Sequence, residues 1–249
     1  RLTAGTTSIT IEATDSGTGI NKYAISTSAV PGSFVSVGKT NNLNITVSEL
    51  KENTTYYVWV KDEAGNQSEH KTVTTSAVPR YTLTINPGQG SITGETTKTG
   101  KNGEQITIPA PTSPSGYTVT LNGNGGKVSQ TSINSNYTFN KWTLSGGGTI
   151  SGNTYTFGNQ NGTITASYSH VGVTLPTPTR EGYTFLGWYT SSTGGSKVGD
   201  AGNIYTPSGN ITIYARWEDR TPPNITRLIP GTTSITIEAT DSGTGINRY

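Results

Sequence analysis

One stretch of nineteen residues occurs twice in this chain, and the duplication limits the folds open to it. GTTSITIEATDSGTGINKY occupies residues 5–23, and GTTSITIEATDSGTGINRY occupies residues 231–249. The match extends outward to residues 1–2 and 227–228, always with an offset of 226 residues. So long a period indicates whole folding units in series rather than one closed globule. We therefore interpret the chain as one period of a tandem array, whose expected partners are neighbouring copies of the same repeat.

The composition favours β-sheets and excludes two classes of partner. Only 13% of the 249 residues are charged, and Thr, Tyr, Val and Ile are frequent, so we predict an all-β protein. A net charge of +2 spread along the chain gives no basic stripe for nucleic acid. No stretch approaches the roughly 20 apolar residues of a membrane span, so we expect no membrane insertion in this segment.

Cysteine and methionine are both absent. This removes disulfides, thiol nucleophiles, thiolate metal sites and the two easily oxidised side chains together. The composition therefore suits an exposed, oxidising location.

The first eighty residues alternate apolar and polar side chains with turn residues between the runs. This pattern predicts a β-sandwich with no long helix. The expected strands lie at residues 7–14, 20–27, 33–38, 42–50, 54–62 and 70–78.

The sequence ELKENTTYYVWVKDEAGNQS at residues 49–68 resembles the end of a fibronectin type III or bacterial immunoglobulin-like module. The resemblance implies a sandwich over residues 1–79 whose opening edge strand is missing. The form of that strand is visible in DRTPPNITRLIP, which precedes the second copy. Residues 219–249 therefore look like the start of the next module.

The composition changes between these modules: residues 81–217 are rich in Gly, Asn, Ser and Thr. Residues 174–217 resemble the internalin-type B-repeat, a small β-grasp-like module of bacterial surface proteins. The resemblance rests on PTREGYTFLGWYT, a GG turn and a closing ITIYARW. Residues 137–168 form a weaker copy, and residues 81–92 and 117–128 resemble opening hairpins. We expect B-repeat-like units at 80–170 and a C-terminal half at 171–218, paired or interlocked, with the ownership of each hairpin open.

The B-repeat signature is interpreted as core packing. Along YTFLGWY, the side chains of Tyr183, Phe185 and Gly187 share one face of a strand. Trp188 reaches that face only if a β-bulge at Gly187 shifts the register. We predict such a bulge.

The titratable residues are too sparse for catalysis. The chain has 15 carboxylates and two histidines, and no Asp or Glu lies between Glu104 and Glu181. Neither His70 nor His170 has a metal-ligand spacing or a nucleophile motif around it, so both are expected to be solvated. We predict no enzymatic activity and no cofactor.

Two loops carry hard oxygen ligands. TDSGTGI contains Asp15, and KDEAGN contains Asp62, Glu63 and Asn66; the fibronectin-like arrangement places both loops at one end of the sandwich. They could bind calcium at a joint between modules. The favoured alternative is that Asp and Asn cap turns beside glycine.

The strand TTYYVWVKD directs its side chains to two faces. Tyr56, Val58 and Val60 are expected inside the sandwich, which turns Tyr57 and Trp59 to the other face. An exposed Tyr–Trp pair could contact a glycan or a neighbouring module, whereas cross-strand packing is the favoured interpretation.

Together, these features predict a structural spacer or stalk of a large extracellular protein on a bacterial surface or cell wall. The first alternative is an adhesive module that binds a host protein or polysaccharide. The second is a filament subunit, in which residues 222–230, PPNITRLIP, supply the missing strand of another chain.

Overall fold

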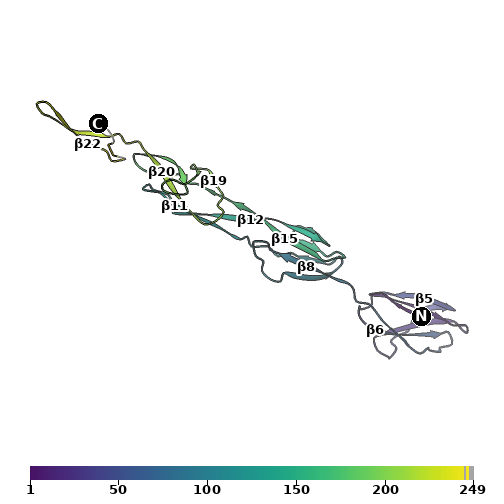
Figure 1. Cartoon of the computed structure of the whole chain (residues 1–249). Coiled ribbons are helices and arrows are strands. Elements are labelled where there is room, and N and C mark those ends of the chain that lie inside the picture. The colour runs from purple at the N-terminus through teal and green to yellow at the C-terminus, as the bar shows by residue number, and fades with distance from the viewer. Residues whose placement is uncertain (244, 247–249) are drawn as a thin grey trace.

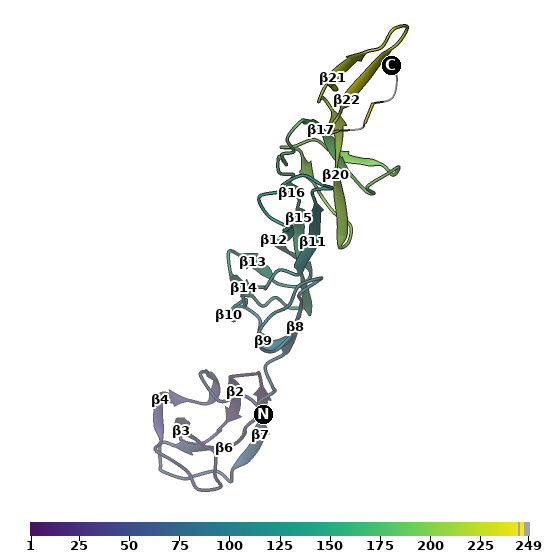
Figure 2. The same ribbon diagram turned by 90° about the vertical axis from the view of Figure 1, so that its left-hand side faces the viewer.

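The chain forms an elongated series of β-sheets. The computed structural model describes residues 1–243, 245 and 246, and its regular elements are all strands, which confirms the all-β class. The sheets follow one another from the N-terminal sandwich to a C-terminal hairpin (Figures 1 and 2). The described residues contain no helix, and therefore none long and apolar enough to cross a membrane.

The N-terminal module is a seven-stranded antiparallel sandwich. One sheet has the order β1-β2-β5 and the other β4-β3-β6-β7. The strands are β1 (Leu2–Ala4), β2 (Ile9–Thr14), β3 (Ile20–Ser26), β4 (Val35–Thr40), β5 (Asn42–Val47), β6 (Thr55–Asp62) and β7 (Lys71–Thr74).

Alternating side chains of both sheets form the core of this sandwich. Ile9 and Ile11 of β2 are fully or almost fully buried against Tyr56 and Val58 of β6. The predicted inward face of β6 is therefore confirmed. Burying side chains of this size stabilises the fold by roughly 1.5–3 kcal/mol each.

The opening strand is present, which corrects our expectation that it is missing. β1 has three residues, and Leu2, Thr3 and Ala4 pair antiparallel with β2. Sequence reasoning missed this strand because a run of three residues is too short to show alternation.

The central block is built around one eight-stranded sheet with the order β18-β17-β20-β11-β12-β15-β8-β9. Two small sheets, β10-β14-β13 and β16-β19, accompany it. The strands are β8 (Arg80–Asn86), β9 (Thr97–Lys101), β10 (Gln105–Thr107), β11 (Ser115–Asn122), β12 (Ser132–Gly146), β13 (Thr149–Ser151), β14 (Thr154–Thr156), β15 (Gly162–Val171), β16 (Val173–Thr174), β17 (Tyr183–Tyr189), β18 (Lys197–Gly199), β19 (Ile204–Tyr205) and β20 (Ile211–Asp219).

This block contains two similar units. In the first, β8 pairs in parallel with β15, which pairs with the second half of β12. In the second, β11 pairs in parallel with β20, which pairs with β17. Asn161 Oδ1 accepts a hydrogen bond from the Thr82 amide at 2.8 Å, and Asn210 Oδ1 accepts the equivalent bond from Thr118 at 2.9 Å.

The two units are interlocked through β12. This fifteen-residue strand pairs with β11 at its start and with β15 along the rest of its length. The hairpin beginning at β8 therefore belongs with β12 and β15, and the hairpin beginning at β11 belongs with β17 and β20. Residue 170 is consequently no spatial boundary, because residues 171–218 complete the sheet that β11 enters.

Each unit has its own aromatic-containing core. The first contains Leu83, Ile85, Ile108, Tyr155, Phe157 and Ile164. The second contains Val119, Leu121, Val173, Leu175, Trp188, Ile213 and Ala215. The small sheets contribute residues to both cores, so they close the open face of each unit.

The predicted β-bulge in YTFLGWY is confirmed. The register of β17 on β20 shifts between Phe185 and Gly187, and Trp188 is fully buried. Gly187 has a φ of 129°, which a side chain would oppose. The first unit has the same shift between Phe139 and Lys141, one to three residues before Trp142.

The chain continues into a hairpin of β21 (Asn224–Pro230) and β22 (Ile235–Thr240). Its apolar side chains are exposed, with Ile235 at 67% and Ile237 at 54%. Their counterparts Ile9 and Ile11 are buried in the N-terminal sandwich. The hairpin thus repeats the pairing of the first two strands of that module.

Candidate functional site at the joints between modules

The first joint is the short segment between β7 and β8, and the sandwich holds its beginning. Thr75 is 1% exposed, and its hydroxyl donates to the Lys51 carbonyl at 2.7 Å. The Ser76 amide donates to the Gly5 carbonyl at 3.0 Å. These contacts fix the point where the chain leaves the sandwich.

Glu52 connects the sandwich to the next unit. Its Oε2 accepts a hydrogen bond from the Val78 amide at 2.6 Å, and its Oε1 lies 2.7 Å from Lys101 Nζ of β9. Arg80 of β8 lies 3.8 Å from the same Oε1. The hydrogen bond from Lys101, followed by that from Val78, lowers the pKa of the Glu52 carboxyl below its ordinary value. One carboxylate therefore binds the linker and both strands of the next hairpin.

The loop that carries Glu52 has a defined shape. Glu49 and Asn53 both have positive φ, of 63° and 48°. The Tyr56 hydroxyl accepts a hydrogen bond from the Lys51 amide at 2.8 Å, and Tyr56 itself is buried. A core residue of the sandwich thus positions the loop that contacts the next unit.

The second joint is the crossing of β11, β12 and β15 between the interlocked units. Ser135 is 3% exposed, and its hydroxyl accepts from the Tyr117 amide at 2.8 Å and lies 2.8 Å from His170 Nε2. The His170 ring stacks on Tyr137 with centroids 4.4 Å apart. These contacts, added to continuous backbone pairing, make this joint part of one sheet.

The third joint is the segment between β20 and β21. The Arg220 amide donates to the Gly182 carbonyl at 2.9 Å, and the Thr221 amide donates to Asp219 Oδ1 at 2.9 Å. A Cβ added to Gly243 would overlap the Asp219 carboxylate, so the loop after β22 lies directly against this joint.

The predicted calcium ligands lie at one end of the sandwich, as expected, and they cap turns. Asp15 accepts from the amides of Gly17 and Gly19 at 3.2 and 2.7 Å. Both oxygens of Asp62 accept from Asn66, each at 2.7 Å, and the side-chain bond lowers the pKa of the Asp62 carboxyl. Glu63 accepts from Asn21. Within the described residues, no three His, Cys, Asp or Glu side chains are grouped to hold a metal.

We expect calcium to leave the thermal midpoint of the sandwich unchanged. Asp15 and Asp62 already accept amide hydrogens that a cation would have to replace. The measurement is thermal unfolding with millimolar calcium against the same concentration of magnesium. Because a ligand that binds only the folded state must raise the midpoint, a rise specific to calcium that Asp62→Asn abolishes would establish the site instead.

Tyr57 and Trp59 pack against each other, which agrees with the favoured interpretation, and Trp59 is not an exposed ring. The two rings share the outer face of β6 with centroids 6.3 Å apart, yet Trp59 is only 3% exposed. His70 covers them, with ring centroids 5.1 Å from Tyr57 and 5.6 Å from Trp59. Tyr57 and His70 therefore both pack against the Trp59 ring.

The histidines differ from each other. His70 is exposed, as expected, apart from its ring contacts. His170 is partly buried against Ser135 and Tyr137, so our expectation of a solvated side chain is wrong there. Among the described residues, His170 contacts Ser135, Tyr117 and Tyr137, and none of these three side chains is a carboxylate that could orient the ring for catalysis.

Sequence reasoning missed the joint residues Glu52 and Lys101. They are 49 positions apart and look like ordinary surface charges. The sequence contains a weak signal for this contact. ELKENT is a charged loop directly before the strand that carries the core residue Tyr56, and the Pro-containing linker follows one strand later.

The comparisons with known proteins find two family models that match parts of the central block. Residues 145–216 match the Listeria-Bacteroides repeat domain, and residues 81–132 match the divergent InlB B-repeat domain. Internalin H of Listeria monocytogenes is 49% identical over 47 residues, which are 19% of this chain and 8% of internalin H. No solved structure matches the chain. Residues 145–216 are therefore similar to Listeria-Bacteroides repeats and residues 81–132 to B-repeats, and the chain spans only a small part of internalin H.

Proposed function

We propose that this chain is a structural spacer, one period of a tandem array in a bacterial surface protein. The internalin-type repeats of the central block support an extracellular, surface location. The duplicated segments at residues 5–23 and 231–249 support the array. In this proposal the sandwich alternates with the interlocked pair of B-repeat units, and the protein extends a more distal part of the molecule away from the cell.

The sandwich is, in this proposal, a fibronectin type III-like module. Its strand order, β1-β2-β5 facing β4-β3-β6-β7, supports that assignment. So does the Tyr56 hydroxyl near the start of β6, which accepts a backbone hydrogen bond from Lys51, five residues upstream. Such a tyrosine corner is typical of Greek-key sandwiches.

A spacer works through its length and stiffness, and the joints provide the stiffness. The observation that carries the proposal is Glu52, which binds the linker and the following hairpin at the same time. In the next block, β12 continues through both units as one strand of fifteen residues, which spans roughly 50 Å. Bending between these units would break backbone pairing rather than flex a linker.

Replacing Glu52 by glutamine should loosen the first joint without unfolding either module. The substitution removes the charge that holds Lys101 and weakens the bond to Val78. Small-angle scattering should show a lower or more widely distributed maximum dimension, while thermal unfolding changes little. Glu95→Gln is the matched control, because Glu95 pairs with Lys98 inside a single unit.

The same joint should respond to acid. Because the pKa of Glu52 is lowered in the docked state, the contact is fully formed above the ordinary value of 4.5 and is lost as pH falls through the lowered value. The scattering profile of the wild type should approach that of Glu52→Gln in this range. A profile identical for both proteins at neutral pH would contradict the stiff-joint model.

An adhesive role would have a different signature. Saturable binding of a host protein or glycan by the intact chain, at concentrations where serum albumin or an unrelated glycan does not bind, would replace the spacer proposal. Substitutions at exposed positions near a ligand would then reduce binding without changing the shape seen by scattering.

A further inference from the structure

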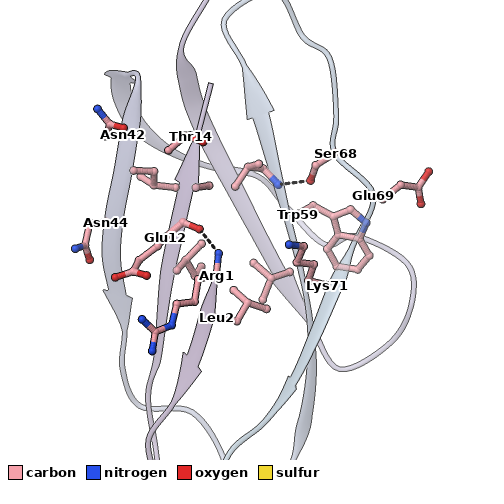
Figure 3. A pocket seen from close by; sticks show the side chains of 15 residues that line it. Arg1, Leu2, Glu12, Thr14, Asn42, Asn44, Trp59, Ser68, Glu69 and Lys71 are labelled. Carbon is pink, nitrogen blue, oxygen red and sulfur yellow. Dashed lines mark hydrogen bonds between the residues drawn. The ribbon is translucent and has the colours of Figure 1, made fainter. Parts of the chain in front are cut away.

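A groove lies along the edge of the N-terminal sandwich, beyond the start of the short strand β1. Its volume is about 640 Å³. Figure 3 shows Arg1, Leu2 and Glu12 on one side and Trp59, Ser68 and Lys71 on the other. The apolar lining comes from both sheets: Leu2, Ile11, Ala13, Leu43, Val58 and Val60. The groove thus reaches the sandwich core beside Arg1, between the two sheets.

In the C-terminal hairpin, β21 corresponds to β1 but extends further along its partner strand. Ala4 pairs with Ile9 and Leu2 with Ile11, while Pro230 pairs with Ile235 and Leu228 with Ile237. With the offset of 226 residues, these registers are identical. β21 continues further, however, because Ile225 pairs with Ala239 and Asn224 with Thr240. The equivalents of those partners in the sandwich are Ala13 and Thr14, which line the groove.

The β-bulge in β21 sets the direction of the Ile225 side chain. The register shifts between Ile225 and Arg227, so Thr226 is the extra residue, and its hydroxyl donates to the Glu238 carbonyl at 3.0 Å. Ile225 then lies opposite Ala239. The equivalent Ala13 contacts the sandwich core and pairs with Leu43. A side chain at the position of Ile225 would therefore point between Leu43 and the two valines of β6.

The start of β1 already has the geometry of a continuing strand. The Arg1 nitrogen donates to the Glu12 carbonyl at 2.6 Å, and the Glu12 amide donates to the Arg1 carbonyl at 2.9 Å. A peptide N–H at the position of the Arg1 nitrogen can donate the same bond. A preceding residue therefore requires no rearrangement of β1.

We propose that this groove binds an extended segment of the preceding copy of the repeat. The segment has the sequence of residues 222–226, PPNIT. The segment pairs with Ala13 and Thr14 in the register that β21 has on β22, and its isoleucine fills the apolar part of the groove. The proposal rests on the array described under the proposed function. It adds a second contact at each joint, in which the linker becomes a strand of the module that follows it.

A strand from a separate molecule fits less well. Residues 227–230 of such a chain are the counterparts of residues 1–4, which already occupy their positions on β2. A complete β21 from another molecule would have to displace β1. A segment that continues directly into Arg1 needs no displacement, and this is why we assign the groove to the preceding repeat.

The test uses the full chain with TPPNIT, the sequence of residues 221–226, added before Arg1. Amide hydrogen exchange should slow by at least about tenfold at Thr14, because its amide lies on the side of β2 that gains a strand, whereas the Glu12 amide already donates to the Arg1 carbonyl. The transition of the sandwich should rise by about 5–10 °C, as expected for one buried isoleucine in a small domain. The matched control carries the same extension with its isoleucine replaced by aspartate, and it should give neither change.

Each other result overturns the inference. Equal exchange at Thr14 in the extended and original chains would show that the groove does not take this segment. Protection that appears in the original chain and increases with protein concentration would show that a second molecule fills it. Scattering from the same samples separates the two proposals. A stiff rod whose amides gain no protection would support the spacer and contradict the groove assignment. Amide protection in a flexible or ligand-binding chain would support the groove assignment and contradict the spacer.

Discussion

Replacing Trp188 by alanine should destabilise the second B-repeat unit by about 3–5 kcal/mol, the usual cost of removing a fully buried aromatic side chain. Trp188 has no exposed surface, and its indole N–H donates to the Pro176 carbonyl at 2.9 Å. It also contacts Phe185 edge to face, with centroids 5.7 Å apart. In a unit with a small core, this loss removes a large share of the stability, so the unit should unfold well before the sandwich.

Leu186 provides the matched control for this prediction. It is the neighbouring extra residue of the β-bulge, and it is 41% exposed. Leu186→Ala should cost about 1 kcal/mol or less, since it leaves the core intact. Urea unfolding followed by tryptophan fluorescence and by circular dichroism gives both values. Equal destabilisation by the two substitutions would contradict the assignment of Trp188 as the centre of the core.

Local patterns in the sequence were sufficient for the features that depend on neighbouring residues. Alternation placed Tyr56 and Val58 inside the sandwich, and the spacing of Phe185 and Trp188 required the bulge that the structure contains. Both inferences use only the two-residue period of a strand and the need to bury large rings. They hold because each concerns one strand and its own two faces.

Pairing between distant strands was less accessible. β8 pairs in parallel with β15, and β11 with β20, although about eighty to ninety residues separate the partners. The sequence of one strand does not indicate which distant strand pairs with it in parallel. The hairpins that begin at β8 and β11 therefore could not be assigned to the two B-repeat units from the sequence. The repeated asparagines provide a signal in retrospect: Asn161 and Asn210 each precede a closing strand, and each accepts a bond from the start of an opening strand.

Alternation of apolar and polar residues predicts which face of a strand a side chain lies on, but it does not predict which other residues cover that face. Trp59 points away from the main core, as the pattern predicts, but it is 3% exposed and packs against Tyr57 and His70. His170 was expected in solvent and instead packs on Tyr137. In both cases the covering group comes from another strand or loop, and the same limit explains why the contact of Glu52 with Lys101 was not foreseen.

The interlocked joint offers the second large effect, because Gly116 has no room for a side chain. It lies in β11, where the register on β12 shifts between Ser115 and Thr118. A Cβ at Gly116 would overlap the Ser135 carbonyl oxygen and crowd the Asn136 nitrogen, and both of these atoms belong to the backbone. Gly116→Ala should therefore separate β11 from β12 locally, at a cost of about 1–3 kcal/mol.

The position of Gly116 makes its effect distinct from that of a simple core defect. Ser135 also accepts from the Tyr117 amide and contacts His170 of β15, so moving it disturbs strands of both B-repeat units. We expect hydrogen exchange to accelerate in β11, β12 and β15 together, with a broader scattering profile. Gly209→Ala is the control, since a Cβ there meets open space. If Gly116→Ala destabilised only residues 171–218, the two units would be independent and the continuous-sheet account of stiffness would fail.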